Sequence, residues 1–243
     1  MKRLIFLFMF FPLIGCQQTE SNHYQASPYK INYEPKKLVQ QEEVKKEMMV
    51  DVPLIKQNPE LKFGCEVTST AMLLQYAGVP VNKMELYKQV KKDPDPLVER
   101  NGNIISWGNP ADGFVGDMTG KKKGYAVFDQ PIEDLVNQYL DGKAINFTNQ
   151  PFSSLLTHVG KGFPIVIWTT GDYKLPNRWE SWEHQGKTIK TPLDLHVVVL
   201  VGYDQEYVYL NDPLSGVKQA KVDKEQFIQS WDALEKRAVS YHE

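Results

Sequence analysis

A single cysteine in the stretch LKFGCEVTSTAMLLQYAG, residues 61–78, lies between a glycine and an apolar run that is typical of a buried helix. Cys65 would be the first residue of that helix, where unpaired backbone N–H groups and the helix dipole stabilise an anion. A thiolate attacks far better than a thiol, so this position predicts a cysteine nucleophile. The alternative is an inert buried thiol, since free cysteine packs like a small apolar residue.

A histidine at the mouth of an apolar strand is the candidate general base. His196 opens the run HVVVLVGYD, and if this strand returns as a hairpin, His196 lies opposite residues 213–215. Asp212 is then a near-diagonal neighbour at about 7–8 Å, within reach of a side chain. A carboxylate there would orient the imidazole and select its tautomer. Asn211 is the alternative orienting residue, but strand alternation places it on the other face of the sheet, so Asp212 is preferred.

Gln57 precedes the cysteine in PLIKQNPELKFGC. Its side-chain amide is a candidate donor to the oxyanion of a tetrahedral intermediate, together with the backbone N–H of the nucleophile. The alternative is a solvated loop glutamine, and the spacing alone leaves both interpretations open.

The N-terminus, MKRLIFLFMFFPLIGCQQ, has a basic start followed by a short apolar run, residues 4–14. This run is shorter than the roughly 20 residues that span a bilayer and is typical of a secretory signal. The residues LIGC that end at Cys16 resemble the bacterial lipobox, which predicts lipid attachment to Cys16 and cleavage before it. An ordinary signal peptide is the alternative. A lipidated Cys16 leaves Cys65 without a disulfide partner, which flags a reactive thiol.

The chain divides into three predicted parts: a lipoprotein signal peptide at 1–15, a lipid-anchored polar tether at 16–51, and one globular domain at 52–243. The tether is too polar to offset the entropy of folding, with a helical turn or two expected across 37–48. In the domain, an early buried helix, further helices and then neighbouring strands predict an α+β fold. The helices are expected near 65–77, 82–92, 131–140, 151–162 and 224–235, and the strands near 163–170, 195–204, 206–212, 216–223 and 238–241.

Composition and motif spacing exclude several classes of function. The formal net charge of −2 argues against a nucleic-acid partner. No spacing resembles a zinc site, and DPDP and DGFVGD lack the regular calcium-loop spacing, so we expect no metal and no cofactor. The segment 93–130 is predicted to be an ordered functional loop. Residues 107–116 and 179–184 are expected to flank a substrate cleft, with no catalytic role for His184.

Several motifs together resemble one family. In order, VPLIKQNPELKFGCEVTSTAML, WGNPADGFVG, GYAVFDQPIEDLV, FPIVIWTT, LHVVVLVGYD, VYLNDPLSG and FIQSWDALEKRAVSY resemble the bacterial double-glycine-peptidase-like proteins of cysteine peptidase family 39, in the papain-like superfamily. The resemblance runs from about 52 to 241 and points to a free-standing, secreted branch. Members that trim bacteriocin leaders are fused to a transporter. This chain has no such part, so leader processing is not implied.

The resemblance implies a papain-like α+β fold, with Gln57 in the oxyanion hole, Cys65 as nucleophile, His196 as base and Asp212 as orienting acid. The expected protein is a monomeric, lipid-anchored extracytoplasmic cysteine peptidase that hydrolyses peptide or amide bonds in a peptide or protein substrate. One alternative is a cell-wall peptide amidase or endopeptidase with the same triad. The other is a peptide-binding lipoprotein without turnover.

Overall fold

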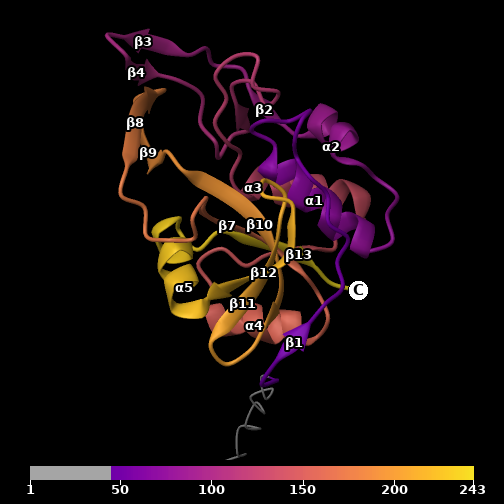
Figure 1. Ribbon diagram of the computed structural model, residues 1–243. Coiled ribbons are helices and arrows are strands. Elements are labelled where there is room, and N and C mark those ends of the chain that lie inside the picture. Colours follow the sequence, from indigo (N-terminus) through magenta and orange to yellow (C-terminus); the bar gives the residue numbers. More distant parts are fainter. Residues whose placement is uncertain (1–44) are drawn as a thin grey trace, which may run out of the picture. The chain divides into compact units, whose positions relative to one another are not determined.

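The computed structural model describes residues 45–243, which fold around a mainly antiparallel sheet (Figure 1). The predicted signal peptide, Cys16 and most of the predicted tether lie outside these residues. The spatial order of the main sheet is β12 (Val217–Asp223), β11 (Tyr207–Asp212), β10 (Leu195–Tyr203), β7 (Ile165–Thr170), β13 (Ala238–Tyr241) and β6 (Ala144–Asn146). Every pair in this order is antiparallel, and the predicted α+β class is confirmed.

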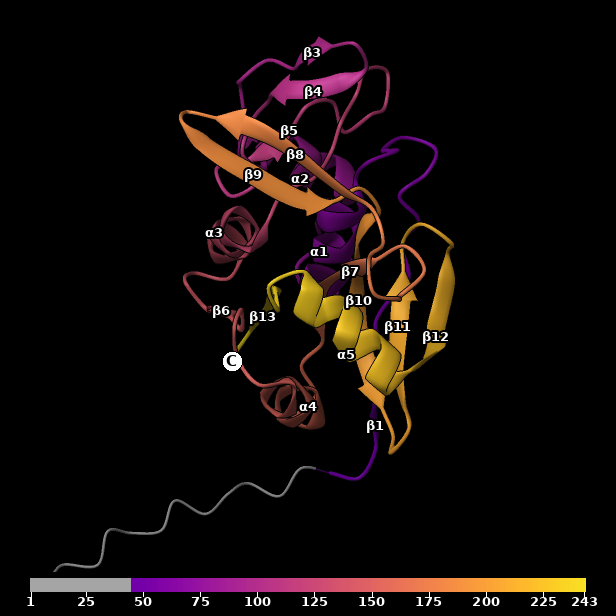
Figure 2. The same cartoon turned by 90° about the vertical axis from the view of Figure 1, so that its left-hand side faces the viewer.

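Helices cover both faces of the main sheet (Figure 2). They are α1 (Cys65–Tyr76), α2 (Lys83–Gln89), α3 (Asp129–Tyr139), α4 (Phe152–Gly160) and α5 (Lys224–Ala233). Side chains alternate between the two faces of a strand, so β7 contributes to two cores. Val166 and Trp168 pack with α1 and α3, while Ile165 and Ile167 pack with α4 and α5.

Helix α1 is buried over its first ten residues, as its apolar sequence predicts. It begins at Cys65 because Gly64 lets the chain turn closely over Leu61. A Cβ at Gly64 would lie only 2.5 Å from the Leu61 Cβ. The helix ends before Gly78, whose φ of +86° favours glycine. The cysteine is thereby fixed at the N-terminus of a rigid, fully packed element.

A second, smaller sheet was not predicted: part of it lies in the segment 93–130, which was expected to be an ordered loop, and the rest had no predicted element. It contains β3 (Val98–Arg100), β4 (Asn103–Ser106), β8 (Trp179–His184) and β9 (Lys187–Pro192), and a parallel pair, β2 (Lys92–Asp93) with β5 (Phe114–Val115), adjoins it. Trp107, Val115 and Trp182 form its small core. Strands β8 and β9 could not be predicted, because most of their residues are polar and exposed, so their sequences show no apolar run. The Gln185–Gly186 turn has positive φ at both residues and is the one sequence feature that could have indicated this hairpin.

The packed domain begins earlier than the predicted boundary at residue 52. Strand β1 (Met48–Met49) pairs with Tyr203 and Gly202 of β10, and Val50 donates its N–H to the Val201 carbonyl. Strand β10 extends beyond its pairing with β7, which stops at Leu200, so its last residues have a free edge for β1. Of the residues expected to form a helical turn, 45–48 are not helical, and 37–44 lie outside the described residues. Within residues 45–243, no helix has the length and apolarity to cross a membrane.

Candidate active site

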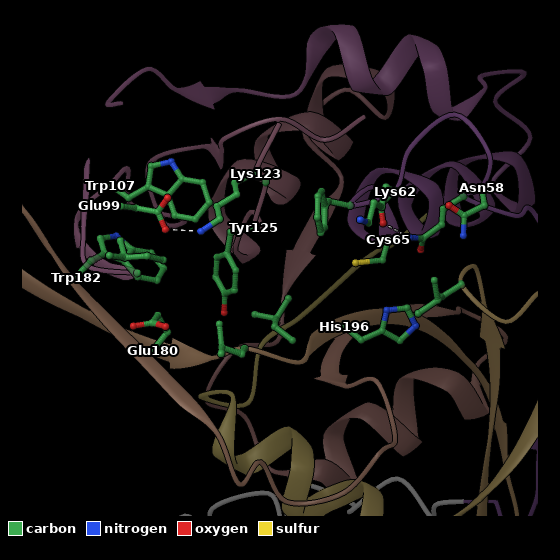
Figure 3. Close-up of a pocket in the computed structure, with 18 residues that line it drawn as sticks. Asn58, Lys62, Cys65, Glu99, Trp107, Lys123, Tyr125, Glu180, Trp182 and His196 are labelled. Atoms are coloured by element: carbon green, nitrogen blue, oxygen red, sulfur yellow. Dashed lines mark hydrogen bonds and ion pairs between the residues drawn. The ribbon is translucent and has the colours of Figure 1, made fainter. Parts of the chain in front are cut away.

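Cys65 and His196 line the same cleft, although 131 positions separate them in the chain (Figure 3). A hydrogen bond one helical turn from the cysteine fixes this juxtaposition. The Ser69 hydroxyl donates to the backbone carbonyl of Val197 at 3.1 Å, and both residues are fully buried. The N-terminus of α1 therefore lies against the start of β10, and the thiol and imidazole open into a cleft of about 820 Å³.

His196 and Asp212 form a buried pair, with the histidine Nε2 2.7 Å from the aspartate Oδ1. The carboxylate also accepts hydrogen bonds from the Leu214 N–H at 2.8 Å, the Ser215 hydroxyl at 2.6 Å and the Tyr173 hydroxyl at 2.9 Å. Burial alone would raise the pKa of Asp212. The hydrogen bond and charge of His196, with the donors at 214 and 215, instead hold that pKa well below its usual range. Asp212 is therefore anionic near neutral pH and fixes the imidazole through Nε2, which leaves Nδ1 for a thiol.

Asn211, the alternative orienting residue, points away from the histidine. Its amide donates to the Val52 carbonyl at 3.0 Å and accepts from the Gln219 N–H at 3.0 Å, so it ties the sheet to the entering chain. The hairpin register pairs Val199 with Asn211, as the predicted return of the strand requires. Strand alternation therefore places Asp212, and not Asn211, against the imidazole.

Gln57 lines the same cleft as Cys65 and is only 2% exposed. Its side-chain amide donates to the Lys62 carbonyl at 2.8 Å, and its backbone N–H donates to the Pro213 carbonyl at 2.9 Å. An amide nitrogen carries two hydrogens, so a second donor remains for the cleft, which Gln57 lines. The Cys65 N–H belongs to the first helical turn and has no acceptor within the helix. Gln57 and Cys65, the two residues expected to donate to an oxyanion, thus line the same cleft.

A buried glutamate beside the nucleophile was not foreseen. Glu66 is fully buried, and its carboxylate accepts hydrogen bonds from the Val127 N–H at 2.9 Å and the Cys65 thiol at 3.4 Å. Burial raises the pKa of Glu66 to about 7. Burial, and then the Glu66 charge, also raise the pKa of the Cys65 thiol well above its usual value. This direction opposes the stabilisation expected at a helix N-terminus, because that expectation took no account of the burial of the thiol or of the carboxylate beside it.

Aromatic and charged side chains from the smaller sheet form the far wall of the cleft (Figure 3). Trp182 packs against Trp107 and Tyr125, with ring centroids 5.8 and 5.4 Å apart respectively. Both segments expected to flank a cleft therefore contribute to its lining. His184 does not line the cleft, and its imidazole instead faces Asp93 and Asp95. The charged lining residues are Lys62, Glu99, Lys123 and Glu180.

Comparison with known proteins gives consistent matches. The sequence profile of the Peptidase C39-like family matches residues 49–239. The uncharacterised protein YvpB of Bacillus subtilis (strain 168) is 38% identical over 181 residues, which are 74% of this chain and 70% of that protein. The crystal structure of a C39-like peptidase candidate from Bacillus anthracis superposes with a TM-score of 0.74 at 38% identity, and the match covers 82% of this chain and 98% of that one.

The family match covers most of the domain and includes the four candidate residues 57, 65, 196 and 212. The helix that begins at the cysteine packs on an antiparallel sheet that carries the histidine, which is the arrangement expected of a papain-like fold. The chain belongs to the Peptidase C39-like family and shares the fold of the C39-like peptidase candidate from Bacillus anthracis.

Proposed function

We propose that this protein is an extracytoplasmic cysteine peptidase that hydrolyses peptide or amide bonds with Cys65, His196, Asp212 and Gln57. The observation that carries the proposal is the buried His196–Asp212 pair at 2.7 Å, in the same cleft as the thiol at the start of α1. Membership of a peptidase family supports the same class of reaction.

The geometry suggests a sequence of proton transfers. His196 Nδ1 takes the thiol proton, the thiolate attacks the substrate carbonyl carbon, and Asp212 stabilises the imidazolium. The Cys65 N–H and the Gln57 amide donate to the oxyanion. The imidazolium then protonates the leaving amine. The amine departs, and the acyl group stays on Cys65 as a thioester. Water, deprotonated by His196, attacks the thioester, so the acid is released and the thiol is restored.

Brief alkylation by iodoacetamide near pH 6, followed by intact-mass measurement and peptide mapping, tests the nucleophile. We expect His196 to accept the thiol proton as the sulfur attacks, so His196→Ala should slow the labelling of Cys65 sharply. Cys65→Ser removes the labelled site, and His242→Ala, an exposed histidine away from the cleft, is the matched control. Labelling of Cys65 that is unchanged in His196→Ala would overturn the proposal.

One observation favours a second candidate, a peptide-binding protein without turnover. The thiol donates to Glu66, and its pKa is raised, so it is protonated in the resting state. A peptide library distinguishes the two candidates. Cleavage that disappears in Cys65→Ser supports the peptidase, while binding without cleavage supports the second candidate. Stem peptides that contain D-amino acids, run beside ordinary L-peptides, test the cell-wall amidase or endopeptidase alternative.

The extracytoplasmic location rests on the sequence of residues 1–16, which resembles a lipobox. We propose that Cys16 carries the lipid that attaches the enzyme to the bacterial membrane. Metabolic labelling with a radioactive fatty acid tests this directly. The label should be lost in Cys16→Ser and kept in Cys65→Ser, and equal labelling of the Cys16→Ser variant would overturn the assignment.

A further inference from the structure

A cluster of ionisable side chains lies behind the aromatic wall of the cleft, where three segments distant in sequence meet. Asp93 comes from β2, Asp112 from the turn before β5, and His184 from the end of β8. One potential ligand atom from each residue lies within 4.8 Å of the other two. Asp95 also faces the histidine, since its Oδ2 lies 3.1 Å from the His184 Nε2.

The histidine is the informative member of the cluster. His184 is 6% exposed, and its Nε2 makes no hydrogen bond to any of residues 45–243. This nitrogen nevertheless faces the carboxylates, with Asp93 Oδ2 at 3.3 Å. A buried polar atom left without a hydrogen bond costs about 1–3 kcal/mol and requires an explanation. A cation between these groups would supply one.

The surrounding backbone holds the carboxylates in place. Asn109 donates its N–H to Asp93 Oδ2 at 3.1 Å and its side-chain amide to Asp112 Oδ2 at 2.7 Å. Gly108 allows the chain to approach this closely, because a Cβ there would lie 2.8 Å from the Asp93 carboxyl carbon. Metal-binding carboxylates are commonly oriented by hydrogen bonds of this kind from a second layer of residues.

We propose that Asp93, Asp112 and His184 bind a Zn²⁺ ion as its three protein ligands. An imidazole nitrogen disfavours Ca²⁺ and Mg²⁺, which prefer oxygen ligands, whereas nitrogen and carboxylate oxygen both suit zinc. Zinc–ligand bonds of about 2.0–2.1 Å in a tetrahedron place neighbouring ligand atoms about 3.3 Å apart. The 3.3 Å separation of the His184 Nε2 from the Asp93 Oδ2 agrees with this spacing. Sequence spacing did not reveal the site because its ligands come from separate segments.

The ion would act as a structural link and take no part in the chemistry. His184 lies two positions from Trp182, whose indole N–H donates to the Gly108 carbonyl at 2.8 Å. Trp107, beside Gly108, lines the cleft with Trp182. Zinc would therefore join β8, β2 and the 107–113 turn, and so fix the aromatic wall against which substrate lies.

Calorimetric titration of Zn²⁺ into the full chain, stripped with a chelator, tests the site. All measurements use the Cys65→Ser background, because a catalytic thiol and imidazole can themselves bind zinc. We expect one equivalent of zinc assignable to the cluster, with the Kd raised at least a hundredfold by His184→Gln. His242→Gln, at an exposed histidine, is the matched control and should leave this equivalent unchanged.

Asp112→Asn is a second variant that tests the site even if His184→Gln fails to fold. Asp112 is exposed, so its replacement should not disturb the core. It should weaken zinc binding at least tenfold while the circular dichroism spectrum is unchanged. Equal zinc binding with and without His184 would overturn the site. Binding of Mn²⁺ but not Zn²⁺ would overturn the choice of metal. No binding of either ion would overturn the proposal in favour of a simple imidazolium–carboxylate cluster.

Discussion

Replacing Glu66 by glutamine should remove a loss of stability that the wild type undergoes as the pH rises through neutrality. The pKa of Glu66 is about 7 in the folded chain, against an ordinary value of 4.5 for a glutamate in water. The folded protein therefore keeps this proton at pH values where the unfolded chain has lost it. The stabilisation is fully present below about pH 4.5 and is lost as the pH rises through about 7.

The magnitude follows from the two pKa values. A pKa difference of about 2.5 is worth about 3 kcal/mol, and about 2.5 kcal/mol of this falls between pH 5 and pH 8. Two other buried groups do not obscure the effect. Burial lowers the pKa of His158 to about 4, so its contribution has the opposite sign, but it is common to both proteins and cancels in their difference. The pKa of Asp212 is held low, so its contribution is lost only in stronger acid.

Urea unfolding from pH 5 to 8 measures the difference. The free energy of unfolding of the wild type, minus that of Glu66→Gln, should fall by about 2.5 kcal/mol over this range. Glu206→Gln, at an exposed position, is the control and should give a flat difference. Parallel curves for the wild type and Glu66→Gln would refute the assignment of this titration to Glu66. The glutamine should also speed alkylation of Cys65 at pH 8, because it removes the negative charge beside the thiol.

Three further substitutions examine how the site is held. Ser69→Ala removes the buried hydrogen bond to the Val197 carbonyl and should lower the free energy of unfolding in urea by about 1–2 kcal/mol. An unchanged urea midpoint would show that other packing holds α1 against β10. Tyr173→Phe removes one donor to Asp212 and should lower kcat about fivefold in a peptide assay, the effect of about 1 kcal/mol; an unchanged kcat would mean that the remaining donors suffice. Gln57→Ala should lower kcat about 10²–10³-fold with little change in thiol labelling, and a loss confined to KM would contradict its oxyanion role.

The main elements of the fold could be predicted where burial leaves a pattern in the sequence. Helix α1 and strands β7, β10 and β11 are apolar runs bounded by glycine, proline or polar residues. The hairpin register then follows from the position of the turn, and it correctly places Asp212 beside His196. The early start of the domain at β1 could not be predicted, since two methionines in a polar segment carry no strand signal.

The chemistry around the nucleophile was less predictable. A glutamate in the first turn of a helix is ordinarily favourable and exposed, so sequence gives no sign that Glu66 is fully buried. Its burial results from the chain crossing at Val127, 61 positions away. The effect on the thiol pKa depends on that long-range contact. Local patterns therefore locate the reactive groups, while distant packing determines their protonation.

Strand β10 places the candidate base His196 and the entry of the chain into the domain at its two ends. It carries His196 near its first residue, while its last residues pair with β1, where the described chain enters the domain. At about 3.3 Å per residue, His196 and Tyr203 are separated by about 23 Å along the strand. The end that carries the candidate base and the end where the described chain enters are therefore opposite ends of one strand. A change at the entry end, such as loss of the β1 pairing, would therefore reach His196 only through the length of β10.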